Sequence, residues 1–120
     1  MSEVFFFNDL MHDDGKPTPD IKAAISFLST EEGGRKGWAK SGYKPNHNFG
    51  LPDGREFYVG EIYFDSEKIV YPGETCEATV RFIPGPGLRE KLKPGQTWRI
   101  QEGGKLVAMG KVLEVIQSLK

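Results

Sequence analysis

The sequence predicts an all-β domain, either a sandwich or a barrel, because short strand-like segments alternate with turns. The clearest segment is TCEATVRF at residues 75–82, in which Cys76, Ala78, Val80 and Phe82 fall on one face. Turn sequences separate such segments along the chain, namely LPDG, YPGE, PGPG and KPGQ. Many short strands divided by glycine and proline turns are typical of these two architectures.

The first segment, TPDIKAAISFLSTEEGG, fits two kinds of secondary structure. Thr18 suits a helix N-cap, Pro19 suits the first helical position, and Gly33 suits the residue after the last turn. The letters IKAAISF within it also alternate apolar and polar residues, as a strand would. The pattern alone therefore leaves both a helix and a strand open.

Three further segments predict strands. EFYVGEIYF is aromatic and branched, TWRIQ places Trp98 and Ile100 on one face, and KLVAMGKVLEVI is apolar on both faces around Gly110. The last pattern suits a strand that is covered on two sides and bulged or bent at Gly110. Cys76 lies on the apolar face of its own segment, so we expect a small core residue rather than a nucleophile.

The tetrapeptide Glu-Gly-Gly-basic occurs twice, as EGGR and as EGGK. Gly103 and Gly104 lie between two alternating segments and predict a two-residue hairpin, because the favoured hairpin turns require positive φ at central positions. If the first segment is a strand, Gly33 and Gly34 predict a second hairpin. On this interpretation the four glycines are structural, and the repeat marks two turns rather than a phosphate cradle or a duplication.

Length and charge restrict the function classes. A chain of 120 residues fits one domain, and 16 Lys+Arg against 17 Asp+Glu give a net charge of -1. That balance provides no general attraction to nucleic acid or to an anionic membrane. The single cysteine excludes an internal disulfide. The start of the sequence lacks the pattern of a signal peptide and no stretch is long enough to span a membrane, so we expect a cytoplasmic chain.

Four motifs, taken in order, are similar to those of a known family. EGGR, GYKP, YPGE and EGGK occur in the order found in the third, C-terminal domain of elongation factor Tu, and at similar spacings. The resemblance covers about residues 20–117. It implies a six-stranded antiparallel β-barrel over residues 20–120, with the first segment as a strand. Residues 1–19 would then be a leader or an extra strand.

The resemblance covers one module of a three-domain protein. The phosphate-binding motif G-x-x-x-x-G-K-[ST] of the family's GTPase domain is absent from the sequence, so we expect no binding of GTP and no cofactor. The glycine-rich stretch IPGPGLREK lacks that spacing and predicts a loop.

In the family, this barrel contacts the tRNA T-stem backbone, the GTPase domain and the exchange factor. The positions that match the tRNA contacts are Arg35, Lys36, Gly103 and Gly104, and Lys105 retains the charge of a family arginine. Gln101 replaces another family arginine, which weakens the basic surface. Arg99 stands where the family has a small residue facing the GTPase domain.

These observations favour a non-catalytic interaction module that binds a protein partner, which would be a translation component or another protein. Trp38 is the aromatic side chain most suited to such a contact, whereas Tyr43 is expected to cover an end of the barrel. The alternative is weak binding to the backbone of tRNA. Its candidate residues are Arg35, Lys36, Lys40, Lys44 and Lys105.

An enzyme is the least supported class. The sequence contains two histidines, His12 and His47, and shows no nucleophile elbow, zinc-ligand spacing or paired-carboxylate motif. His47 and Asp53 share the segment HNFGLPDG, which predicts a loop histidine near a carboxylate without an identified nucleophile. The run of His12, Asp13 and Asp14 predicts a solvated loop, so we expect no metal site.

Overall fold

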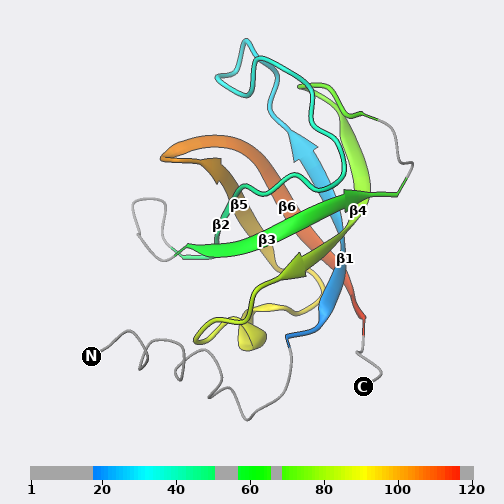
Figure 1. Cartoon of the computed structure of the whole chain (residues 1–120), viewed down its shortest axis with the longest axis vertical. Coiled ribbons are helices and arrows are strands. Elements are labelled where there is room, and N and C mark those ends of the chain that lie inside the picture. The colour runs from blue at the N-terminus through cyan, green and yellow to red at the C-terminus, as the bar shows by residue number, and fades with distance from the viewer. Residues whose placement is uncertain (1–17, 51–56, 66–68, 117–120) are drawn as a thin grey trace.

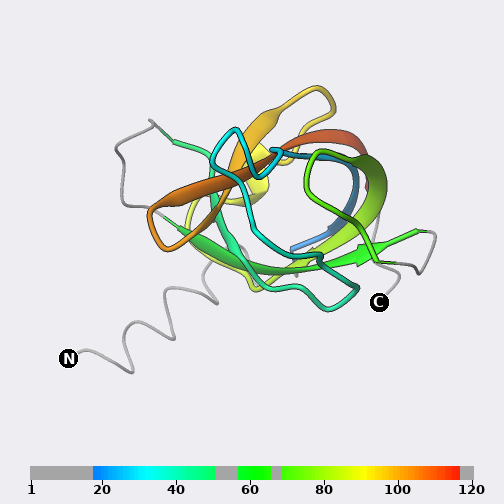
Figure 2. The same cartoon turned by 90° about the horizontal axis from the view of Figure 1, so that it is seen from above.

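The computed structural model describes residues 18–50, 57–65 and 69–116, and its strands close into a six-stranded antiparallel barrel (Figures 1 and 2). The strand order around the barrel is β1-β4-β3-β2-β5-β6. The strands are β1 (Asp20–Phe27), β2 (Asn46–Asn48), β3 (Tyr58–Phe64), β4 (Thr75–Phe82), β5 (Thr97–Glu102) and β6 (Lys105–Ile116). The predicted fold class is thereby confirmed; the predicted segment 1–19 lies almost wholly outside the described residues.

The ambiguous first segment is a strand. β1 pairs antiparallel with β4 on one side and with β6 on the other, so both of its backbone edges are hydrogen-bonded. Ile21, Ala23, Ile25 and Phe27 all point into the core. A helix would leave these alternate residues on different sides, so the pairing on both edges decides between the two patterns.

The segments 75–82 and 97–101 form the strands that their alternation predicts. Ala78, Val80 and Phe82 are buried in β4, and Trp98 and Ile100 are buried in β5. Cys76 is half-buried on the same side of β4, and burial raises the pKa of its thiol to about 11. A thiol with so high a pKa is a poor nucleophile at neutral pH, as expected for a residue that packs against the core.

The irregularities of β6 lie at other positions than Gly110. The register passes from Ile100 opposite Ala108 to Gln101 opposite Leu106, which leaves Val107 as an extra residue. Because of this bulge, Val107 and Ala108 are both buried although they are consecutive. The register is regular at Gly110, so the bulge expected there is wrong. The expected cover on both faces is met only in part, since Met109 is half-buried whereas Lys111 and Leu113 are exposed.

Gly110 is required by the packing of a neighbouring side chain. It pairs in regular register with Trp98 of β5, and a Cβ atom at Gly110 would lie 2.6 Å from carbons of the Trp98 ring. The indole thus occupies the space that a side chain would fill.

The EGGK turn forms the predicted two-residue hairpin. Glu102 of β5 pairs with Lys105 of β6, and Gly103 and Gly104 connect them. Gly103 has a φ of +64°, whereas Gly104 does not adopt a left-handed φ. A positive φ at the first central residue alone matches a type II′ turn, so strain argues for glycine at Gly103 and not at Gly104.

The EGGR turn is not a hairpin, contrary to the prediction. In the described part of the chain β1 pairs with β4 and β6, and the residues after Gly34 form a loop. Gly33 has a φ of +97°, and the amide of Gly34 donates to the Ser29 carbonyl at 2.9 Å. A Cβ at Gly34 would lie 2.5 Å from the carbonyl oxygen of Leu28, so close packing requires this glycine.

Two short elements were not predicted. The three residues of β2 complete the barrel between β3 and β5. A short 3₁₀ helix (Arg89–Lys91) lies within IPGPGLREK, where a loop was expected. The leucines on either side of it, Leu88 and Leu92, are buried and belong to the core.

Replacement of Gly110 by alanine is expected to lower the free energy of unfolding by about 1–3 kcal/mol, because the new methyl group overlaps the Trp98 ring. Gly104→Ala is the matched control, since its Cβ meets open space and its φ is not left-handed, and it should change stability by less than about 0.5 kcal/mol. Chemical denaturation measures both. Equal effects of the two substitutions would contradict the packing described for Trp98.

Candidate binding surface

Arg35 joins the two Glu-Gly-Gly motifs in space. Its Nε donates to Oε2 of Glu102 at 2.6 Å, although 67 residues separate the two in sequence. The Tyr43 hydroxyl donates to the same carboxylate oxygen, and the guanidinium lies 4.9 Å from the centre of the Tyr43 ring. The basic residue that ends the first motif therefore binds the glutamate that opens the second.

The same guanidinium also holds the loop that carries Trp38. Its Nη1 donates to the carbonyl oxygens of Gly37 and Trp38. Burial opposes ionisation of Glu102, but the hydrogen bonds from Tyr43 and Arg35 outweigh it and the pKa of Glu102 lies below its ordinary value. Arg35 is thus committed to an internal charge network.

The other predicted cations are spread over several elements. Lys36, Lys40 and Lys105 are exposed, and Lys44 forms an ion pair with Glu61 at 3.2 Å. Arg99 is half-buried in β5 and donates to the carbonyl of Gly50. Gln101, expected on the surface because it replaces a family arginine, is instead buried.

Tyr43 covers the core as predicted, while Trp38 faces solvent. The Tyr43 ring packs against Phe27 with ring centroids 6.1 Å apart. Trp38 is 48% exposed, and Tyr71, which sequence reasoning missed, is 50% exposed. They flank the isolated bridge between Ala39 and Val70. Tyr71 lies shortly before β4 in the sequence, and Ile83 lies directly after it. Trp38 and Tyr71 therefore lie near one end of β4, and Ile83 lies at the other end.

His47 is a buried strand residue rather than a loop base. The indole Nε1 of Trp98 donates to His47 Nδ1 at 3.0 Å. Because the indole can only donate, Nδ1 is the acceptor and the proton lies on Nε2, which is 3.1 Å from the Gly60 carbonyl oxygen. Burial lowers the pKa of His47 to about 4, so the imidazole is neutral. Asp53, its proposed neighbour, lies outside the described residues.

Beside the hydrogen bonds of His47 lie two buried side-chain amides, those of Asn48 and Gln101. Nδ2 of Asn48 donates to Oε1 of Gln101 at 3.1 Å, and the amide of Gly50 donates to Oδ1 of Asn48 at 2.8 Å. Nε2 of Gln101 in turn donates to the carbonyl of Gly104 at 3.3 Å. Gln101 therefore connects β2 to the EGGK turn.

Three further exposed apolar side chains that sequence reasoning missed lie in or just before β3 and directly after β4. Phe57, Val59 and Ile83 are 40%, 45% and 54% exposed, and the Ile83 amide donates to the Val59 carbonyl at 2.9 Å. Pro84 follows directly and is half-buried. We call these four residues the β3–β4 surface.

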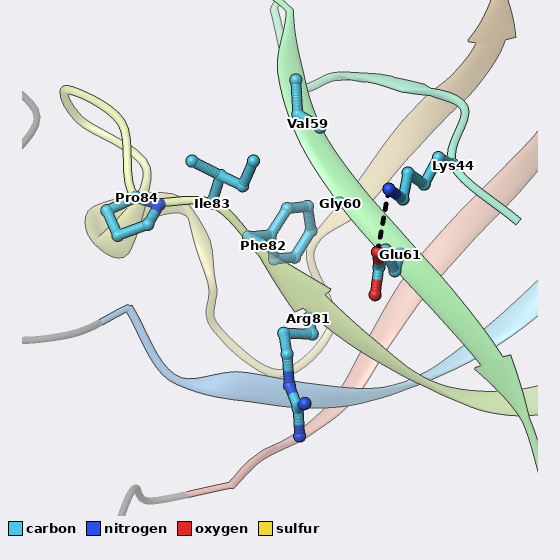
Figure 3. Close-up of a pocket in the computed structure, with 8 residues that line it drawn as sticks. All are labelled: Lys44, Val59, Gly60, Glu61, Arg81, Phe82, Ile83 and Pro84. Atoms are coloured by element: carbon cyan, nitrogen blue, oxygen red, sulfur yellow. Dashed lines mark ion pairs between the residues drawn. The ribbon is translucent and has the colours of Figure 1, made fainter. Parts of the chain in front are cut away.

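Two shallow pockets, each of about 300 Å³, flank the β3–β4 surface and share Val59, Ile83 and Pro84 as lining. The first is bordered by Lys44, Glu61 and Arg81 (Figure 3). The second is bordered by Phe57, Tyr58 and the loop after Pro84. In that loop the carbonyl of Pro86 accepts a hydrogen bond from the Tyr58 hydroxyl at 2.6 Å, which fixes the pocket wall.

Stability should depend on the protonation of His47. The folded-state pKa of about 4 lies below the ordinary value of 6.5, so the unfolded chain binds more protons between these values. The neutral His47 contributes about 3 kcal/mol to the free energy of unfolding. This contribution is fully present above pH 6.5 and is lost as the pH falls to about 4. Denaturation at several pH values should therefore give a flatter profile for His47→Gln in this window. Parallel profiles would contradict a neutral buried imidazole.

Removal of the Arg35 charge should destabilise the barrel, since it breaks the ion pair with Glu102 and the bonds to two loop carbonyls. We expect Arg35→Gln to lower the free energy of unfolding by about 1–2 kcal/mol. Lys36→Gln, at an exposed neighbouring residue, should change it by less than about 0.5 kcal/mol. An Arg35→Gln variant as stable as the Lys36→Gln variant would show that Arg35 is free for other ligands.

Within residues 18–50, 57–65 and 69–116, no three His, Cys, Asp or Glu side chains are grouped to hold a metal ion. No helix in this described part has the length and hydropathy needed to cross a membrane. No family model matches the chain.

Proposed function

We propose that the chain is a cytoplasmic, non-catalytic interaction module that binds a protein partner through the β3–β4 surface. The observation that carries this proposal is the contiguous exposure of Phe57, Val59 and Ile83 beside two pockets. The resemblance to the third domain of elongation factor Tu favours a component of the translation machinery as the partner.

Exposed apolar side chains that adjoin one another and are bordered by charges are typical of protein interaction sites. On the β3–β4 surface the apolar residues adjoin Lys44, Glu61 and Arg81. The backbone beneath is held by the pairing of β3 with β4, so little conformational entropy is lost when a partner binds. Apolar contact of this kind is also insensitive to salt.

The alternative, weak binding of tRNA backbone through Arg35, Lys36 and Lys105, has less support. Arg35 donates to Glu102 and to two carbonyls, which leaves Lys36 and Lys105 as the exposed cations of that set. Two phosphate contacts give a log–log salt slope of only about -2. Such binding would be lost at physiological salt.

Capture from an extract of the source cells tests the proposal. The full chain and its Leu113→Asp variant should retain the same protein at physiological salt, whereas Ile83→Asp should lose it. Leu113 is the matched control because it is an exposed apolar residue of β6, which β1 separates from β4. Circular dichroism and thermal melting establish that the variants are folded.

Two results would contradict this function. The first is that the full chain, Leu113→Asp and Ile83→Asp all capture the same proteins, or that none of them captures any protein. The second is submicromolar binding of labelled tRNA at physiological salt that Lys36→Glu and Lys105→Glu abolish. The second result would make RNA binding the primary function.

A further inference from the structure

Two facing charged side chains at the border of the first pocket pair with other residues and not with each other. Glu61 of β3 lies directly opposite Arg81 of β4 in the strand register. Glu61 nevertheless pairs with Lys44 at 3.2 Å, and Arg81 pairs with Asp20 of β1 at 3.3 Å. Figure 3 shows Glu61 directed toward Lys44 and the Arg81 side chain extending away from both.

The border of this pocket offers hydrogen-bond donors more than acceptors. The side chains of Lys44 and Arg81 are 61% and 66% exposed, whereas those of their partners Glu61 and Asp20 are 31% and 28% exposed. Glu61 also accepts a hydrogen bond from the Tyr63 hydroxyl, which occupies more of its acceptor capacity. An ammonium and a guanidinium carry three and five N–H donors, so each cation retains donors for a ligand.

The side of the pocket away from its charged border is apolar. Val59, Ile83 and Pro84 provide the side chains of this apolar wall, and Gly60 and Phe82, whose ring points into the core, complete the lining (Figure 3). A ligand that matches both halves carries an apolar group next to a negative charge. A polyanion fits poorly, because Glu61 lies at the border and the wall has no donors for further phosphates.

We infer that this pocket binds a segment of the protein partner in which an apolar side chain adjoins a carboxylate. The apolar side chain packs on Val59 and Ile83, and the carboxylate approaches Lys44. Arg81, which is directed toward Asp20 but is 66% exposed, contributes when its side chain turns toward the pocket. The inference rests on the proposed function and specifies the chemistry of the partner. The carboxylate accepts a hydrogen bond from Lys44 without displacing its ion pair with Glu61, because the ammonium has donors left.

Three small probes that differ only in charge test this inference on the full chain. They are 4-phenylbutanoate, 4-phenylbutanamide and 4-phenylbutylamine, each titrated while the backbone amides of Gly60, Glu61 and Ile83 are followed by NMR. The carboxylate should shift these amides and bind about two- to fivefold more tightly than the amide, and the amine should bind most weakly.

Variants separate the charge from the apolar wall. Arg81→Gln and Lys44→Gln should each reduce the preference for the carboxylate over the amide, and the double variant should abolish it. Lys22→Gln should preserve the preference, since Lys22 pairs with Asp65 and does not line the pocket. Ile83→Ser should weaken binding of all three probes.

Equal binding of the three probes, a preference for the amine, or no shift at these amides with any probe would overturn the inference. The proposed function fails separately, when Ile83→Asp captures the same proteins as the unaltered chain. If Ile83→Asp loses the captured protein while the probes show no charge preference, the interaction surface stands and a carboxylate ligand is excluded.

Discussion

A buried chain of hydrogen bonds from Trp98 through His47 to the Gly60 carbonyl holds the barrel closed. β2 has three residues, and only two of them pair with β3, so its backbone ladder alone is a weak connection. The buried hydrogen bonds add one connection from β5 to β2 and another from β2 to β3. Each of these polar groups is buried, and leaving any one without a partner would cost about 1–3 kcal/mol.

The residues of this hydrogen-bonded row also determine the shape of the outer surface. A Cβ at Gly60 would lie 2.9 Å from the Phe82 ring and 3.1 Å from His47 Nε2, so β3 needs a glycine at this point. Phe82 in turn packs on His47 with ring centroids 5.0 Å apart. Because side chains alternate along a strand, fixing Gly60 and Phe82 inward fixes their neighbours outward. The interior contacts of two residues therefore position the pocket that their neighbours line.

The fold was largely predictable because β4 and β5 alternate clearly, and because four ordered motifs resemble a known barrel. β2 was not predictable, since Asn-His-Asn carries no apolar pattern and becomes a strand through partners distant in sequence, such as Trp98. The two Glu-Gly-Gly motifs also differ in ways that depend on partners elsewhere in the sequence. Glu102 lies in a hairpin and binds Arg35, whereas Glu32 accepts a hydrogen bond from the Ser29 amide within its own turn.

Less of the candidate surface was predictable than of the fold. The resemblance to the family and its positive charge identified Arg35 as a candidate binding residue, but its ion pair with Glu102 depends on contacts across 67 residues. The exposure of Val59 and Ile83 depends on which strands lie beside them, and no element within residues 18–50, 57–65 and 69–116 covers them. Of the predicted binding residues, Lys44 is the one that lines a pocket of the β3–β4 surface.

Hydroxyl-radical footprinting of the chain, free and bound to its captured partner, tests most directly whether the β3–β4 surface is the interaction site. The method reports the solvent exposure of individual side chains, and both candidate regions contain reactive residues. We expect Phe57, Val59 and Ile83 to become protected, while Trp38 and Tyr71 keep the exposure of the free chain. Protection of Trp38 and Tyr71 with Ile83 unchanged would contradict the account and place the partner at the opposite end of β4.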